Sequence, residues 1–373
     1  MSGRTDRIDH LRLVRTEGVG SVTYQRLMDR YRTPGAALAA LPHLARAGGR
    51  AEVPRIPPAP EAERELEQTA KAGGRMVFLG DPDYPRLLAT LSDPPPCLIV
   101  QGDIALADQR CVASVGGRNA SANGQRMAET LAADLAPHVT VVSGLARGID
   151  TASHTGAMRT GHTVAVIAGG IDQPYPPENV ALQKAIAEGH CVVTEAPIGC
   201  VPQSRHFPRR NRIIAGLSLG VVVVEAAQRS GSLITARVAA EQGRDVFAVP
   251  GSPLDPRARG GNDLIRQGAI LVETAADVLD NLSVYGPATP LGPSELMATD
   301  TASDIESLET SPSEARGHVL SLLSEDPTQV DDLLRRCQLS PSVTMAVLLE
   351  LELAGRVETL PGNRIARLPG GYS

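Results

Sequence analysis

The fold is decided by residues 139–170, VTVVSGLARGIDTASHTGAMRTGHTVAVIAGG. Two apolar runs of strand length, 139–142 and 163–168, flank a stretch of helical length in this segment. The run TVAVIA is almost continuously apolar and rich in β-branched residues, which predicts a strand with both faces covered. A strand, a helix and a second strand in this order are typical of a parallel sheet with helices on each side.

The same alternation of strands and helices extends from about residue 75 to residue 282. The other apolar runs of strand length lie at 76–79, 97–101, 111–115, 191–194, 219–224 and 246–249. Most of them are separated by stretches long enough for a helix. Residues 75–282 therefore predict an α/β fold with a mostly parallel, doubly wound, Rossmann-like sheet.

Residues 1–60 predict a separate helical domain, which the Pro-rich stretch 53–60 connects to the sheet. In TEGVGS (16–21), Gly18 and Gly20 bracket Val19, so the chain can turn tightly between two helices. This is the pattern of a helix-hairpin-helix or SAM-like unit. Residues 1–50 hold nine arginines and four acidic residues. Such a hairpin either binds DNA phosphates through its backbone N–H groups or serves only for packing.

The C-terminal part predicts a linker and a winged-helix domain. Residues 286–314 contain six acidic residues, four prolines and no basic residue, which predicts a flexible acidic linker. Residues 315–369 predict three helices followed by two strands, with Ser340 as N-cap and Pro341 in the first turn of the third helix. Residues 337–355 contain no basic residue. We therefore expect the third helix to meet protein rather than to serve as the main DNA site.

The composition favours a cytoplasmic protein without a membrane anchor. The chain has 373 residues and a net charge of −6, so it is not a uniformly basic nucleic-acid coat. Of its 36 basic residues only Lys71 and Lys184 are lysines, and guanidinium groups suit phosphate well. No secretory signal is visible at the N-terminus, and the longest uncharged apolar stretch is too short to span a bilayer. Five dispersed cysteines are typical of a reducing compartment.

Loops rich in Gly, Ser and Arg follow five consecutive predicted strands. The carboxyl ends of parallel strands share one edge of the sheet, and ligands of open α/β sheets bind there. The loops SGLARGID (143–150) and SGSLITA (230–236) predict anion sites, because glycine amides and helix N-termini favour phosphate. The segment RHFPRRNR (205–212) adds arginines without an acidic neighbour, which predicts a phosphate track. Phe207 within it either stacks on a base or anchors the loop.

Several motifs of enzymes are missing from the sequence. No GxGxxG follows a strand, no GxxxxGK[ST] occurs, and the eight histidines lack metal-ligand spacing. Ser143 and His154 are close in sequence, but no acidic residue is placed to orient the histidine as a general base. We therefore expect no catalytic residue, no metal and no cofactor.

The loop sequences resemble the DprA (Smf) family of DNA-processing proteins. The matching stretches include VASVGGRNAS, VVSGLARGIDTASH, TVAVIAGGIDQPYPPEN, FPRRNRIIAGLS and SGSLITA, in the family's order over residues 75–282. The resemblance implies an extended Rossmann fold and a homodimer. It also implies sequence-independent binding and protection of single-stranded DNA, and loading of the RecA recombinase during natural transformation and recombination.

The loops and the resemblance together define the predicted site residues. The expected DNA-binding residues are Arg118, Ser143, Gly144, Arg147, Gly148, Arg205, Arg209, Arg210, Asn211, Arg212, Gly231, Ser232 and Thr235. The expected dimer contacts are Leu264, Ile265, Ile270 and Leu271. Two positions depart from the family pattern: Gly117 stands where Ser is frequent, and Pro177 stands where some relatives carry Lys.

An enzyme is the alternative interpretation. Phosphoribohydrolases of the lysine-decarboxylase-like family hold a nucleotide phosphate with a PGGxGTxxE signature. The corresponding stretch here, RSGSLITARVAAE (229–241), lacks the double glycine, and Glu241 is displaced from the position of the catalytic acid. A protein adaptor without a ligand would leave the arginine cluster unexplained.

Overall fold

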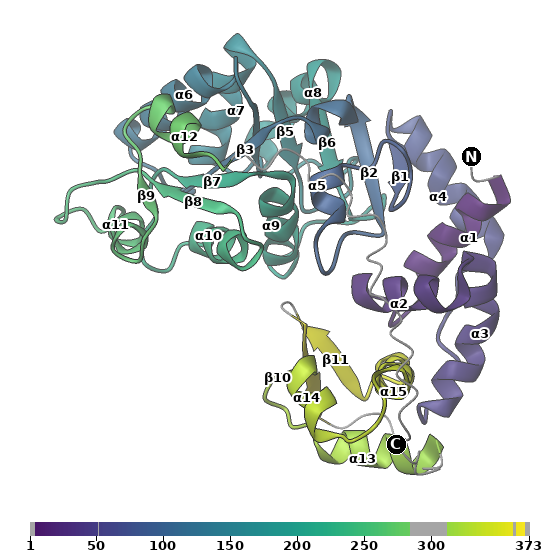
Figure 1. Cartoon of the computed structure of the whole chain (residues 1–373). Helices are drawn as coiled ribbons and strands as arrows, with labels where there is room; N and C mark the ends of the chain where they lie inside the picture. Colours follow the sequence, from purple (N-terminus) through teal and green to yellow (C-terminus); the bar gives the residue numbers. More distant parts are fainter. Residues whose placement is uncertain (1–3, 51, 284–311, 361–362, 370–373) are drawn as a thin grey trace. The chain divides into compact units, whose positions relative to one another are not determined.

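The computed structural model describes residues 4–50, 52–283, 312–360 and 363–369 (Figure 1). The chain divides into two compact units, residues 64–287 and residues 1–63 together with 288–373. The first unit contains the predicted sheet. The second unit combines the N-terminal helical domain with the winged-helix domain, which the sequence had suggested as two separate domains.

A nine-stranded sheet forms the centre of the larger unit. Its strands are β1 (Arg75–Phe78), β2 (Cys97–Gly102), β3 (Cys111–Val115), β4 (Thr140–Ser143), β5 (Thr163–Val166), β6 (Cys191–Thr194), β7 (Gly220–Val223), β8 (Asp245–Ala248) and β9 (Ile270–Leu271). They lie in the order β1-β2-β6-β5-β4-β3-β7-β8-β9. From β6 to β9 neighbouring strands are parallel, whereas β2 pairs antiparallel with both β1 and β6. The predicted mostly parallel α/β fold is confirmed.

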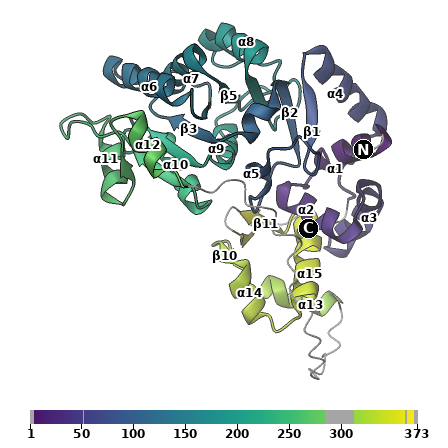
Figure 2. The ribbon, with the colours of Figure 1, turned by 45° about the horizontal axis from the view of Figure 1, so that its top comes forward.

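Helices cover both faces of this sheet (Figures 1 and 2). The helical segments of the unit are α4 (Ala59–Lys71), α5 (Arg86–Ala89), η1 (Ile104–Asp108), α6 (Ala122–Leu135), α7 (Ile149–Thr160), η2 (Pro177–Asn179), α8 (Val180–Gly189), α9 (His206–Leu217), α10 (Ser232–Glu241), α11 (Arg259–Arg266) and α12 (Ala275–Asn281). Buried residues of α6, α7 and α12 pack on one face, and those of α5, α9 and α10 on the other.

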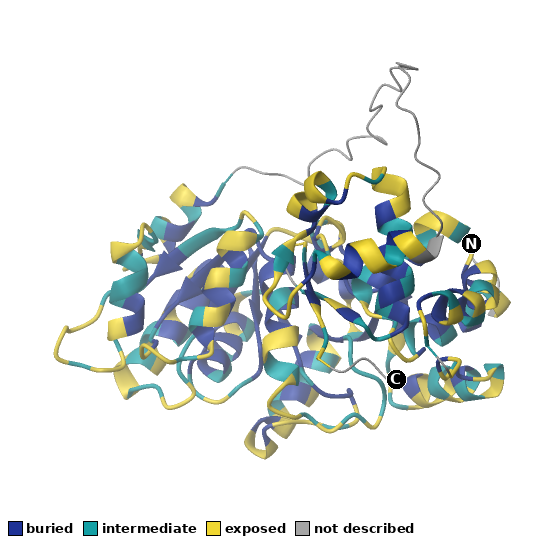
Figure 3. Cartoon of the chain, turned by 90° about the horizontal axis from the view of Figure 1, so that it is seen from below, coloured by how far each residue is buried: buried dark blue, intermediate teal, exposed yellow. Residues whose placement is uncertain are grey.

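The strand sequences explain this layering. Strands β3, β4, β5, β6 and β7 are buried along their whole length, as their β-branched, uninterrupted sequences predict (Figure 3). Successive side chains alternate between the faces: Val112 packs with α6 and α7, while Cys111 and Ala113 pack toward α9 and α10. Because helices cover both faces of the sheet, a ligand site can form only from the loops at the strand ends.

The smaller unit contains the helices and the short sheet of the two chain ends. Its elements are α1 (Arg4–Val14), α2 (Ser21–Tyr31), α3 (Pro34–Ala47), α13 (Pro312–Ser321), β10 (Thr328–Gln329), α14 (Val330–Arg336), α15 (Pro341–Leu353), β11 (Val357–Leu360) and β12 (Arg364–Arg367). The winged-helix sheet has three strands in the order β10-β12-β11, one more than the predicted two-stranded wing. Most of the predicted linker, residues 286–311, lies outside the described residues, and its last residues, 312–314, already belong to α13.

Candidate nucleic-acid interface

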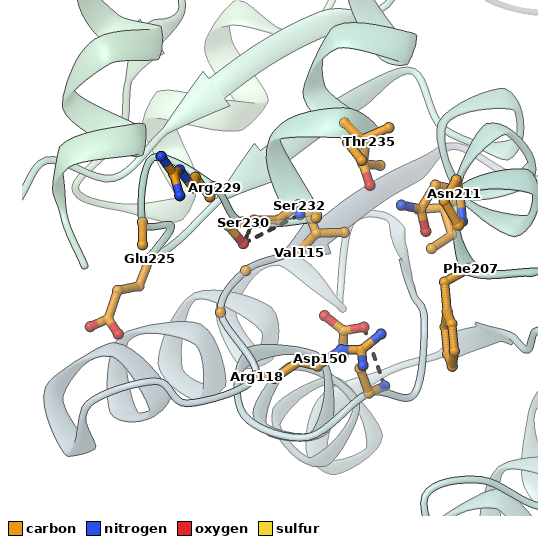
Figure 4. Close-up of a pocket in the computed structure, with 18 of the residues that line it drawn as sticks. Val115, Arg118, Asp150, Phe207, Asn211, Glu225, Arg229, Ser230, Ser232 and Thr235 are labelled. Atoms are coloured by element: carbon orange, nitrogen blue, oxygen red, sulfur yellow. Dashed lines mark hydrogen bonds between the residues drawn. The ribbon is translucent and has the colours of Figure 1, made fainter. Parts of the chain in front are cut away.

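A pocket of about 450 Å³ lies at the carboxyl ends of β3 and β7 (Figure 4). These two strands are neighbours, but the chain continues from β3 to β4 on one side and from β7 to β8 on the other. The pocket therefore occupies the topological switch point, where open α/β sheets bind their ligands. Its lining comes from the loop after β3, from α9 and from the loop before α10.

The N-terminus of α10 forms one wall of this pocket. Ser230, Gly231, Ser232 and Thr235 all line it, and the first turn of α10 contains no acidic residue. The hydroxyl oxygens of Ser230 and Ser232 lie 2.7 Å apart. A helix N-terminus carries a partial positive charge, so this wall favours an anionic group.

The loop SGLARGID is held by groups of the protein itself. The backbone N–H of Ala146 donates to Asp150 Oδ2 at 3.3 Å, and Asn179 Nδ2 donates to the carbonyl oxygen of Leu145 at 2.9 Å. Burial raises the pKa of Asp150, while the nearby Arg210 opposes that rise. A carboxylate of the protein therefore occupies part of the position that the sequence had suggested for phosphate.

Arg210 is a structural residue of the pocket floor. Its side chain is 5% exposed, and its Nη1 donates to the carbonyl oxygens of Gly144, at 2.5 Å, and Val166. Burial lowers the pKa of Arg210 to about 10. A Cβ at position 144 would lie 2.0 Å from Nη1, so any side chain there would displace the guanidinium of Arg210. The phosphate contact of Arg210 stays a prediction, and within the structure its guanidinium joins the end of β5 to the loop after β4.

Two further predicted arginines are paired with carboxylates. Arg212 Nη2 lies 2.5 Å from Glu195 Oε2, and its Nη1 donates to the carbonyl oxygen of Asp93 at 2.7 Å. Arg147 Nη2 lies 2.6 Å from Glu178 Oε1 at the surface. Arg212, in the middle of α9, therefore connects this helix to the segments that contain Asp93 and Glu195. Arg147 is exposed, but its charge is already compensated.

Three exposed arginines at or next to the pocket lack such partners. Among the described residues, no hydrogen bond or ion pair engages the guanidinium of Arg118, Arg209 or Arg229. Arg118 and Arg229 line the pocket, on opposite sides of Ser232 and Val115 in Figure 4. Arg209 lies on α9, whereas Arg205 precedes this helix and its Nε donates to His206 Nε2 at 3.5 Å. The guanidinium groups of Arg118, Arg209 and Arg229 are therefore available to an external anion.

Two aromatic rings lie beside this cationic group. The guanidinium carbon of Arg118 is 4.6 Å from the centroid of the Phe207 ring, within the range of a cation–π contact. The ring of Tyr175 is 5.7 Å from that of Phe207, and the Tyr175 side chain is 44% exposed. Two of the nine aromatic side chains of the sequence thus lie together, and Phe207 belongs to the pocket lining.

The structure separates the predicted residues into groups. Those that line the pocket are Arg118, Arg210, Asn211, Gly231, Ser232 and Thr235. Those that lie outside its lining are Ser143, Gly144, Arg147, Gly148, Arg205, Arg209 and Arg212. Sequence reasoning missed Arg229 and Tyr175. The signal for Arg229 was its place in the loop that follows β7, directly before the SGS stretch.

Ser143 and His154 do not form a nucleophile pair. Ser143 is buried and its hydroxyl donates to the carbonyl oxygen of Ser114 at 2.6 Å. His154 is buried as well, and its Nδ1 lies 2.7 Å from the hydroxyl of Thr163. Burial lowers the pKa of His154 to about 3. Within the described ranges, no group of three or more His, Cys, Asp or Glu side chains is arranged for a metal ion.

The displaced Glu241 is also far from the pocket. It ends α10, whereas the pocket lies at Ser232, where this helix begins. Nine residues of α-helix span about 14 Å. This geometry does not place a catalytic acid against a phosphate at the N-terminus of α10.

The chain matches three protein-family models in order. They are the DprA-like N-terminal HHH domain over residues 4–68, the DNA recombination-mediator protein A over residues 75–283, and the DprA winged helix domain over residues 305–363. Among the described residues, no helix combines the length and the apolar character that crossing a membrane requires.

Individual relatives agree with these matches. A DNA processing protein DprA of Bacillus subtilis is 42% identical over 226 residues, which are 60% of this chain and 76% of the relative. Protein Smf of Escherichia coli is 39% identical over 284 residues, 75% of this chain and 74% of the relative.

Two solved structures are similar as well. DNA processing protein A of Streptococcus pneumoniae has 33% identity and a TM-score of 0.64, covering 76% of this chain and 99% of that one. DNA processing protein A of Helicobacter pylori, described for its single-stranded DNA binding mode, has 27% identity and a TM-score of 0.51, covering 56% and 95%. The larger unit with its switch-point pocket and the two flanking domains thus place this chain in the DprA (Smf) family of DNA recombination-mediator proteins.

Proposed function

We propose that this protein binds single-stranded DNA without strong sequence preference, at the carboxyl edge of its parallel sheet. The observation that carries the proposal is the set of unpaired arginines, Arg118, Arg229 and Arg209, around a switch-point pocket. A surface arginine without a carboxylate partner keeps its full charge for phosphate, and its guanidinium suits phosphate geometry. The similarity to the Helicobacter pylori protein supports the same ligand.

The pocket wall and the arginines make different contacts with the DNA backbone. Ser230, Ser232 and the N-terminus of α10 face the space that Arg118 and Arg229 border. A phosphate there receives hydrogen bonds from hydroxyl and backbone groups and charge from two guanidinium groups. Arg209 and Arg205 extend the positive surface along α9, so the neighbouring phosphates of the strand follow in that direction.

Phe207 and Tyr175 provide the contact with bases. Single-stranded nucleic acid is commonly bound by aromatic side chains on which bases stack, and every base has a face that can stack. Tyr175 presents an exposed ring next to Phe207. Stacking of this kind explains binding without sequence preference.

The assembly and the biological role belong to the same proposal. β9 is the last strand of the sheet, and Leu271 in it is 45% exposed. We place a homodimer contact there, with Ile270, Leu264 and Ile265 behind it. The protein then protects incoming DNA and helps load the RecA recombinase during natural transformation and recombination, without acting as an enzyme.

Fluorescence anisotropy with an unstructured oligothymidylate tests the DNA site. We expect the single strand to bind more tightly than a duplex of equal length, with an affinity that falls as salt rises. The variant Arg229→Ala should weaken binding, whereas Arg159→Ala, whose guanidinium is paired with Glu129 on the surface of the same unit and outside the pocket lining, is the matched control. Equal affinities of Arg229→Ala and the unmodified protein, together with equal affinities for single and double strands, would overturn the proposal.

A further inference from the structure

Helix α15 is buried on two different sides within the smaller unit. Val347, Leu348 and Leu351 belong to the core of the winged-helix domain. Leu349 and Leu353, only 2% and 0% exposed, belong instead to the core of the N-terminal helices. Their neighbours in that core include Leu13, Tyr24, Leu27, Leu38 and Leu41. The third helix of the winged-helix domain thus joins two cores.

Charged groups at the edge of this contact are paired across it. Arg26 Nη1 of α2 lies 3.3 Å from Glu352 Oε2 of α15, and their side chains are 11% and 13% exposed. Arg50 Nη1 donates to the carbonyl oxygen of Leu353 at 3.4 Å, while its Nη2 lies 3.0 Å from Glu17 Oε1. Glu17 belongs to the hairpin between α1 and α2. A single arginine therefore connects that hairpin to the end of α15.

The backbones of the two domains also touch. A Cβ at position 48, just after α3, would lie 2.0 Å from the carbonyl oxygen of Glu350 and 2.8 Å from the Cβ of Ala354. Only glycine allows this approach. Arg316 of α13 completes the contact, since its Nη1 donates to the carbonyl oxygen of Ala47 and its Nε lies 3.3 Å from Glu350 Oε2.

A helix in these surroundings cannot enter a DNA groove. Proteins with helix-turn-helix folds read DNA by laying an exposed recognition helix in the major groove. In α15 the side next to the winged-helix core is covered by other helices, and Glu350 and Glu352 would repel phosphate. The hairpin of the N-terminal domain is occupied as well, because the N–H of Glu17 donates to the carbonyl oxygen of Arg55 and that of Val19 to Thr16.

We propose that α15 is the docking helix by which the winged-helix domain binds the N-terminal helical domain of its own chain. The two ends of the chain, which are separated by more than two hundred residues, fold as one cooperative unit. In this protein the winged-helix domain makes a contact between two domains of one chain, and its partner is the helix-hairpin-helix domain. The inference does not depend on where single-stranded DNA binds.

A charge swap in the full-length protein tests this docking. The single variants Arg26→Glu and Glu352→Arg each place like charges side by side, and the double variant restores an opposite pair. Hydrogen exchange of the backbone amides in α3 and α15 should become at least tenfold faster in each single variant and return most of the way in the double variant. The control is Arg55→Glu, which affects the exposed pair Arg55–Glu61 of the same unit.

Two outcomes would overturn the proposal. If both single variants exchange like the unmodified protein, the contact is absent in solution. If a saturating DNA duplex slows exchange in α15, this helix reads DNA after all. Should the charge reversals unfold the unit, Glu352→Gln removes the ion pair without repulsion, and faster exchange confined to α2, α3 and α15 would support the docking. Exchange that stays unchanged in that variant and in Leu349→Ala would contradict it.

Discussion

The guanidinium of Arg118 lies over the ring of Phe207, 4.6 Å from its centroid, at the mouth of the switch-point pocket. Arg118 lies in the loop after β3, and Phe207 lies in the first turn of α9, almost ninety positions later in the sequence. Their contact places the charge that attracts a phosphate next to the ring on which a base can stack. A variant of Arg118 therefore tests the phosphate contact, and a variant of Phe207 tests stacking on bases.

Replacing Phe207 by alanine should weaken binding of single-stranded DNA by about 5- to 150-fold, because stacking of a base on an aromatic ring contributes about 1–3 kcal/mol. Anisotropy titrations with oligothymidylate at fixed salt measure the change. Phe207→Tyr keeps a ring and is the control, with an affinity close to that of the unmodified protein. An alanine variant that binds normally would show that Phe207 only anchors its loop.

Replacing Arg118 by alanine should reduce the dependence of affinity on salt. Each phosphate contact that is lost lowers the slope of log K against log salt by about 0.7 for single strands. The slope is measured between low and moderate salt with the same oligonucleotide. A parallel decrease in affinity at all salt concentrations, with an unchanged slope, would contradict a phosphate contact of Arg118.

Arg212→Ala should act on stability rather than on DNA. Arg212 pairs with Glu195 and approaches Asp93, and all three side chains are at least three-quarters buried. Removing one partner leaves carboxylates without compensation, which costs about 3 kcal/mol. Urea unfolding measures this loss, and the salt slope of DNA binding should stay as it is. A variant that is as stable as the unmodified protein but has a lower salt slope of DNA binding would show that Arg212 contacts phosphate.

His154 should make the larger unit less stable in mild acid. Burial lowers its folded-state pKa to about 3 from the ordinary value of 6.5, so the unfolded chain binds a proton more readily between these values. The contribution of His154 is fully present above pH 6.5 and is lost as the pH falls toward 3, with a slope of about 1.4 kcal/mol per pH unit. Urea unfolding of the unmodified protein and of His154→Gln at pH 5, 6 and 7 measures it. Identical pH dependence of both proteins would contradict this prediction.

Truncation after Asn281 should lower single-strand affinity by less than tenfold, about 1.4 kcal/mol. The sheet and its pocket lie within residues 64–287, so the DNA site stays in the truncated chain. The same truncation removes α15 and uncovers Tyr24 and Leu27 of the N-terminal core, which should therefore melt at lower temperature. A loss of several hundredfold with the sheet still folded would make the winged helix a main DNA site.

The proposed dimer contact is tested by charge on β9. Leu271→Glu together with Ile265→Glu should yield monomers in light scattering, since a carboxylate in an apolar two-fold contact is not compensated. Leu254→Glu is the control, because Leu254 is 91% exposed in a different loop of the same unit. A folded double variant that is still dimeric would place the contact elsewhere.

The amino-acid pattern alone predicted eight of the nine strands in residues 75–282, all except the two-residue β9, because uninterrupted β-branched runs are stable only between two covering layers. It also located the glycine- and arginine-rich loops at one sheet edge, since the ends of parallel strands coincide there. The three helices of residues 315–369 could also be predicted, because helical periodicity is a local property of the sequence.

Which arginines lack a carboxylate or carbonyl partner could be seen only in the folded structure. In RHFPRRNR four arginines look alike, yet Arg210 bonds to the carbonyl oxygens of Gly144 and Val166 and Arg212 pairs with Glu195, while Arg209 has no such partner among the described residues. The helical turn of α9 turns neighbouring side chains about 100° apart, so adjacent arginines point into different surroundings. The partner of α15 was hidden for a related reason: Leu349 and Leu353 look like core residues of their own domain, and only the fold of both chain ends shows that they fill another.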